Sequence, residues 1–181
     1  MGQYYKPIIL GNGKVKATIK AWMYSHDYGS GLKLMEHSWM LNGFVGAFES
    51  QLIPGAKHYK SRVVWAGDYA DEETNSKTNL YSRCSDKTQI APASTVLPDE
   101  YRFIVNHTKK EYVDKREVID NDGWRIHPLP LLTCEGNGRG GGDYGYPDNN
   151  NIVGSWARDV ISVEKTYPND FTKICFDLVE C

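Results

Sequence analysis

The sequence QYYKPIILGNGKVKATIKAWMY, residues 3–24, consists of two β-rich runs separated by the turn Gly11-Asn12-Gly13. An Asn-Gly pair between two such runs is the strongest short-range signal for a β-hairpin. We therefore expect residues 3–10 and 15–24 to pair as antiparallel strands. This hairpin predicts a fold that is built on a β-sheet.

Apolar residues recur at helical spacing across residues 37–52, and the pattern stops before Pro54. This period predicts the main helix of the protein. Gly43 and Gly46 lie inside it, and each lowers helix stability by about 1 kcal/mol relative to alanine. At these glycines we expect the backbone either to pack closely against a neighbour or to break the helix.

The rest of the chain reads mostly as short strands separated by turn-forming residues. The β-rich stretches are 62–66, 101–105, 111–118, 124–133, 156–165 and 171–179, with a short helix at 80–84 and a loop at 85–98. The two prolines in 124–133 favour a sheet edge. We expect a single-domain α+β fold over residues 1–181, with a largely antiparallel β-sheet and one main helix packed on a face.

The composition indicates in which cellular compartment the protein is expected and which classes of partner it favours. Hydrophobic residues make up 40% of the chain and charged residues 24%, as in globular proteins, and the net charge is −2. The chain lacks the basic excess that favours nucleic acids and the run of about 20 apolar residues that a membrane helix needs. Its first residues read as a strand and not as a secretory signal. We expect a cytoplasmic protein without a membrane or nucleic-acid partner; a homo-oligomer stays open.

The four cysteines, Cys84, Cys134, Cys175 and Cys181, are widely spaced and form no Cys-x-x-Cys pair. This spacing indicates neither a zinc site nor a disulfide framework, so we expect free thiols. The acidic run 68–73 does not match a known metal-binding spacing either. The sequence therefore predicts no metal and no cofactor.

A glycine-rich segment, residues 135–144, is the most unusual part of the sequence. Its glycines would let backbone N–H groups approach a ligand, and its arginine could hold an anion such as phosphate. The candidate ligand-binding residues here are Arg139, Gly140, Gly141, Asp143 and Tyr144. The segment matches neither the dinucleotide-binding fingerprint nor the P-loop, so a flexible hairpin loop is the alternative interpretation.

Trp156 and Arg158 follow this segment and complete the candidate site. An indole beside a guanidinium is suited to stacking a nucleotide base and pairing with a phosphate. The alternative is an ordinary strand in which Trp156 points inward and Arg158 forms an ion pair. The leading hypothesis is a non-enzymatic protein that binds a small molecule, with a phosphate-bearing or nucleotide-type ligand.

Two other functions stay open from the residues alone. One is a protein-binding inhibitor that uses the acidic run Asp68 to Glu73 and exposed tyrosines against a basic partner. The other is a small hydrolase with His26 or His37 as the base and Asp68 orienting it. The chain has no Gly-x-Ser-x-Gly nucleophile motif, and no catalytic residue is assigned.

Several phrases of the chain resemble a group of small uncharacterised proteins of gut bacteria and their phages. They are residues 1–7, 65–71, 127–133, the glycine-rich segment and residues 154–159. The resemblance spans most of the chain and carries over no activity, cofactor or catalytic residue. A phage setting would imply a role in countering host defences, by sequestering a nucleotide signal or by blocking a defence protein.

Overall fold

A computed structural model describes residues 3–11, 14–19, 32–84, 89–90, 95–121, 123–136 and 152–176 of the chain. The strands are β1 (Tyr4–Gly11), β2 (Lys14–Ile19), β3 (Leu32–Lys33), β4 (Ser61–Gly67), β5 (Gln89–Ile90), β6 (Phe103–Asn106), β7 (Glu111–Asp114), β8 (Asp120–Asn121), β9 (Trp124–Arg125), β10 (Cys134–Glu135), β11 (Val160–Glu164) and β12 (Thr172–Lys173). The helices are α1 (Leu34–His37), α2 (Gly43–Glu49), α3 (Leu80–Arg83), α4 (Pro128–Thr133) and the 3₁₀ helix η3 (Lys115–Glu117).

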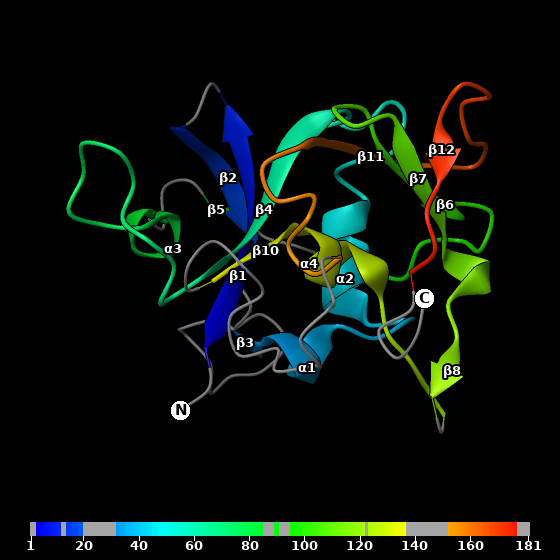
Figure 1. The fold of residues 1–181 in the computed structure, drawn as a ribbon, viewed down its shortest axis with the longest axis horizontal. Helices are drawn as coiled ribbons and strands as arrows, with labels where there is room; N and C mark the ends of the chain where they lie inside the picture. The colour runs from blue at the N-terminus through cyan, green and yellow to red at the C-terminus, as the bar shows by residue number, and fades with distance from the viewer. Residues whose placement is uncertain are drawn as a thin grey trace.

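One mixed but mostly antiparallel sheet organises the described residues (Figure 1). Its strand order is β12-β7-β6-β11-β4-β1-β2-β5, with β3 and β10 paired to β1 and β4 off this path. The predicted hairpin is confirmed, because β1 and β2 pair antiparallel with Ile8 opposite Thr18. The predicted α+β class and the largely antiparallel sheet are confirmed as well.

The central strands β1 and β4 are covered on both faces. Alternate residues of β4 point to opposite sides, so Val63 and Trp65 join the main core while Val64 and Ala66 join a smaller one. Helices α2 and α4 pack in the main core, and Leu80 of α3 packs in the smaller one. Trp65 is fully buried at the centre of the main core, with the ring of Phe48 edge-on against it.

The predicted main helix at 37–52 is wrong in its bounds, because the structure has two helices, α1 and α2, separated by a non-helical turn. Leu41 has φ +67°, a left-handed conformation that a continuous helix does not allow. Asn42 then caps α2, since its side-chain oxygen accepts hydrogen bonds from the N–H groups of Phe44 and Val45 at 2.9 and 3.2 Å. The break therefore comes just before Gly43.

The prediction for residues 124–133 is also wrong in its second half. Only Trp124–Arg125 is a strand, and α4 begins at Pro128. Proline fits the first helical position, where the backbone N–H would have no partner within the helix. The ring of His127 caps α4, since its Nδ1 accepts a hydrogen bond from the N–H of Leu129 at 3.2 Å.

Two findings bear on the expected compartment. Cys84 and Cys134 carry thiols, but Cys175 takes part in a disulfide bond, so the prediction of free thiols is wrong for Cys175. In the parts of the chain that the structure describes, no helix has the length and apolar character needed to cross a bilayer.

Candidate functional site

A cavity of about 570 Å³ lies beside α2 and is lined by side chains from four separate parts of the chain. These parts are residues 39–49, 96–102, 115–116 and 123–127. The lining includes four cationic side chains, namely Arg102, Lys115, Arg116 and Arg125, and two carboxylates, namely Glu49 and Asp99. Three aromatic residues, Trp39, Tyr101 and Trp124, also line it.

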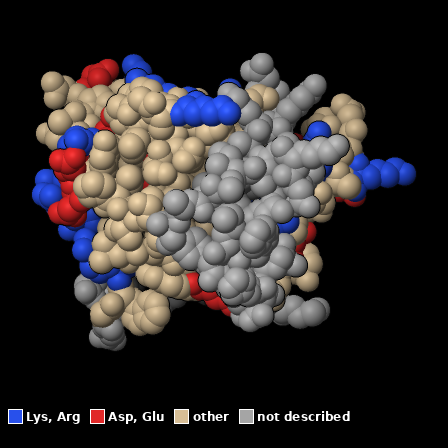
Figure 2. Space-filling model, turned by 180° about the vertical axis from the view of Figure 1, so that it is seen from behind, with Lys and Arg blue, Asp and Glu red and all other residues tan. Residues whose placement is uncertain are grey.

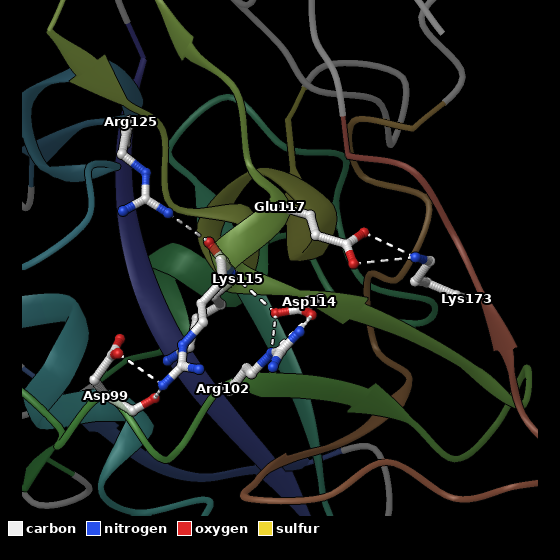
Figure 3. Close-up of polar contacts among 8 residues, drawn as sticks. Asp99, Arg102, Asp114, Lys115, Glu117, Arg125 and Lys173 are labelled. Carbon is white, nitrogen blue, oxygen red and sulfur yellow. Dashed lines mark hydrogen bonds and ion pairs between the residues drawn. The ribbon is translucent and has the colours of Figure 1, made fainter.

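The segment that leaves β7 positions several of the cationic groups (Figure 3). Asp114, the last residue of β7, is buried, and both of its carboxylate oxygens accept from Nε of Arg102, at 2.6 and 2.7 Å. Its Oδ1 also accepts from the backbone N–H of Arg116 at 3.0 Å, which caps the 3₁₀ turn. Arg102 and this turn are therefore fixed by one carboxylate.

Arg116 and Arg125 are less strongly neutralised than Arg102. Arg116 pairs with Asp99 at 2.8 Å, but the side chain of Asp99 is 86% exposed. Arg125 donates from Nη2 to the backbone carbonyl of Lys115 at 2.9 Å, and no carboxylate of the described residues pairs with it. An ion pair as exposed as Arg116–Asp99 contributes roughly 0–1 kcal/mol and is readily exchanged for another anion.

The buried side of the cavity holds a cluster of Glu49, Lys115 and His127. Oε1 of Glu49 lies 2.7 Å from Nζ of Lys115 and 3.2 Å from Nε2 of His127. Because Nδ1 of His127 accepts from a backbone N–H, its proton is on Nε2 and is directed to Glu49. Burial lowers the pKa of His127, which favours this neutral form.

Glu49 stays ionised in this cluster. Burial alone would raise its pKa, but the hydrogen bonds from His127 and Lys115 and the charge of Lys115 outweigh burial and lower the pKa of Glu49. Among the described residues, both bonding partners of Glu49 use Oε1. The second carboxylate oxygen therefore remains as an acceptor in a residue that lines the cavity.

An apolar and aromatic group of side chains surrounds the solvent side of the cavity. The rings of Trp39 and Trp124 meet edge-on, with centroids 6.0 Å apart and an interplanar angle of 84°. Trp124 is 60% exposed, and Leu41 and Val96 are exposed beside the same cavity. An exposed indole face is the type of surface on which planar ligands stack.

Gly46 allows the cavity to close on one side. A Cβ atom at this position would lie 2.1 Å from the backbone oxygen of Thr95, so only glycine fits between α2 and the segment that leads to Val96. This close approach confirms one of the two expectations for the helix glycines. The packing holds residues 96–99 against α2, where they line the cavity.

The structure places only two of the sequence-predicted ligand-binding residues. Arg139, Gly140, Gly141, Asp143 and Tyr144 lie outside the described residues. Trp156 is 0% exposed, and its Nε1 donates to Oε2 of Glu111 at 2.8 Å. It therefore points inward, as the alternative interpretation has it, and no face of its ring is open for stacking.

Arg158 is held between two carboxylates and does not line the cavity. Its Nε donates to Oε2 of Glu135 at 2.7 Å, and its Nη1 donates to Oε2 of Glu73 at 3.1 Å. Although burial opposes its charge, the hydrogen bonds to Glu135 and Glu73 raise the pKa of Arg158 above its usual range. In this arrangement the guanidinium already has its anionic partners.

Of the residues of the hydrolase hypothesis, the structure describes His37 and Asp68, and these two do not form an accessible acid–base group. His37 is fully buried; its Nδ1 donates to the carbonyl of Lys33 at 2.8 Å and its Nε2 accepts from Nε1 of Trp65 at 2.7 Å. Burial lowers the pKa of His37 to about 3. Asp68 accepts from the backbone N–H of Tyr4, and His26 lies outside the described residues.

Sequence reasoning missed the cavity because its lining comes together only in the folded chain. The local signals were the adjacent pairs Lys115-Arg116 and Trp124-Arg125, in which a cation follows a cation or an aromatic residue. Figure 2 shows blue and red side chains next to one another along one margin of the rear face. No group of three metal-binding side chains forms within the described parts of the chain.

The comparisons with known proteins add no relative. No protein-family model, no curated protein and no solved structure matches this chain.

Proposed function

We propose that this protein binds a small phosphate-bearing molecule in the cavity beside α2. The observation that carries the proposal is the lining of a space of about 570 Å³, in which Arg125 donates to a backbone carbonyl and Arg116, among the described residues, pairs only with the exposed carboxylate of Asp99. That volume lies within the range of roughly 300–1,000 Å³ that is typical of small-molecule sites. These two weakly neutralised guanidinium groups in a partly enclosed space favour an anionic ligand.

The chemistry of the arginines favours phosphate among anions. Each guanidinium has five N–H donors in a planar fork that matches two phosphate oxygens. Arg125 uses one donor on a backbone carbonyl, and Arg116 donates from Nη2 alone to the solvent-exposed carboxylate of Asp99. Both therefore have donors that a phosphate can take up without breaking a buried ion pair.

The first test measures the binding of inorganic phosphate, pyrophosphate, ribose 5-phosphate and nucleoside monophosphates by calorimetry, followed by chromatography of the recovered ligand. Arg125→Ala and Arg116→Ala are expected to weaken binding about tenfold or more, because each removes charge-assisted hydrogen bonds of roughly 1.5–3 kcal/mol. Arg83→Ala is the matched control, since Arg83 is exposed on α3, on the opposite side of the molecule from β7 and β8 (Figure 1).

The variants distinguish binding in the cavity from binding at the glycine-rich segment and from no phosphate binding. Binding that is lost in the cavity variants, kept in Arg83→Ala and followed by recovery of intact ligand supports the proposal. No binding of any of these phosphates by the wild-type protein refutes it. Loss of binding in Arg139→Ala, with the cavity variants unaffected, would instead place the ligand at the glycine-rich segment.

A second candidate function is recognition of a basic protein surface by the acidic loop that follows β4. Asp71 and Glu72 are exposed, and Tyr69 is exposed beside them, whereas Glu73 is engaged with Arg158. Reversing Asp71 and Glu72 to lysine is expected to abolish salt-sensitive partner capture and to leave phosphate binding unchanged. Unchanged capture by this variant would reject the candidate.

A further inference from the structure

The solvent side of the cavity carries a recognition surface that phosphate alone would not use. Trp124 is more than half exposed, although burial of an indole ring is energetically favourable. The ring of Trp39 contacts that of Trp124 edge-on. A planar group on the ligand would cover Trp124 without any change in the fold.

The buried side of the same cavity offers an acceptor that a phosphate would not approach. Glu49 is ionised, and its Oε2 has no partner among the described residues. A carboxylate repels phosphate and accepts from N–H and O–H groups. The ligand that satisfies this oxygen therefore carries a hydrogen-bond donor, such as an exocyclic amine, a ring N–H or a sugar hydroxyl.

The three kinds of group fit within the length of one small molecule. A round cavity of about 570 Å³ is about 10 Å across. A phosphate on the arginines, a donor at Glu49 and a ring on Trp124 would therefore belong to one ligand of nucleotide size. A simple phosphate or a sugar phosphate would leave the indole exposed.

We propose that the ligand is a nucleoside phosphate whose base stacks on Trp124 while its phosphate contacts Arg116 and Arg125. This inference rests on the proposed function and adds the ligand class and the base-binding residue. The base contributes affinity through Trp124, separately from the contribution of the arginines. Stacking of a base on an aromatic side chain is sequence-tolerant, so purine and pyrimidine ligands both gain from it.

The test compares nucleoside 5′-monophosphates with ribose 5-phosphate, which has the same phosphate and sugar but no base. At least one nucleotide is expected to bind about tenfold or more tightly than ribose 5-phosphate. Trp124→Ala is expected to remove this difference and to leave the affinity for ribose 5-phosphate unchanged, and Trp124→Phe to keep most of it. The nucleotide should also quench tryptophan fluorescence in the wild type more than in Trp124→Phe.

The outcomes separate this inference from the proposed function. If ribose 5-phosphate binds through Arg116 and Arg125 and no nucleotide binds more tightly, the inference is overturned and the proposed function stands. A base-dependent gain that survives in Trp124→Ala also overturns it, because the base then lies elsewhere. If neither class of phosphate binds, the proposed function fails and the inference fails with it.

Discussion

Replacing Lys115 with methionine tests the buried cluster on which the cavity is built. The variant removes the cation 2.7 Å from Glu49, in a place where the side chains of Lys115 and Glu49 are only 9% and 4% exposed. Breaking a buried ion pair typically destabilises a protein by about 3–5 kcal/mol, because the remaining charge stays uncompensated. We expect a loss of about 3 kcal/mol, at the lower end of this range, since His127 still donates to the same carboxylate oxygen.

The measurement is urea unfolding at pH 7, followed by tryptophan fluorescence, for the wild type, Lys115→Met, and the double variant Lys115→Met/Glu49→Leu. The double variant removes both charges, so we expect it to recover to within about 1 kcal/mol of the wild type. A loss of less than about 1 kcal/mol in Lys115→Met would refute the reasoning. A double variant no more stable than the single one would also refute it.

Three further predictions concern other parts of the fold. Because burial lowers the pKa of His37 to about 3 from 6.5, the unfolded state binds the proton first, and stability falls as the pH drops below about 6.5. Between pH 6.5 and 5 the free energy of unfolding, measured by urea titration, should fall less in His37→Gln than in the wild type. The difference between the two falls should be about 2 kcal/mol at most. Gly46→Ala should lower the melting temperature and weaken phosphate binding, because the added Cβ would overlap the backbone of Thr95. Overpacking of this kind typically destabilises a protein by about 1–3 kcal/mol. An unchanged melting temperature would contradict the close packing. Arg158→Met removes the cation that pairs with the buried Glu135, so thermal unfolding should show a loss of about 1–3 kcal/mol. Phosphate binding in the cavity should be unchanged, and weaker binding would count against the cavity as the site.

The sequence predicted well those elements whose signals are local. The Asn-Gly turn was enough for the first hairpin, and the apolar run at 62–66 was enough for β4. The period over residues 37–52 was misleading because Trp39 and Met40, before the break, line the cavity, whereas the apolar residues after it pack in the main core. Asn42 marks the break, and an asparagine before a run of small and apolar residues could have been read as a helix cap.

The candidate site could not be predicted in the same way. Its cations come from 102, 115–116 and 125, and their approach depends on how β7, the 3₁₀ turn and β9 pack against α2. In contrast, the glycine-rich segment was predicted as the binding site because its composition is unusual over a few consecutive residues. Trp156 and Arg158 form hydrogen bonds with Glu111 and Glu135, which are far from them in the sequence, so these partners could not be predicted from neighbouring residues.

The pairing of β4 has a consequence for how this protein folds as it is synthesised. β4 lies between β1 and β11, and Ser61 pairs with Ile161, 100 residues further along the chain. At roughly 5–20 residues per second, the ribosome needs about 5–20 s to add that intervening stretch. During this time β1, β2 and β4 can pair, but the other edge of β4 stays open until β10 reaches Trp65 and Ala66 and β11 reaches Ser61 and Arg62. A nascent chain of this protein therefore exposes an unpaired strand edge for seconds, and chaperone binding at that stage should depend on residues 61–67.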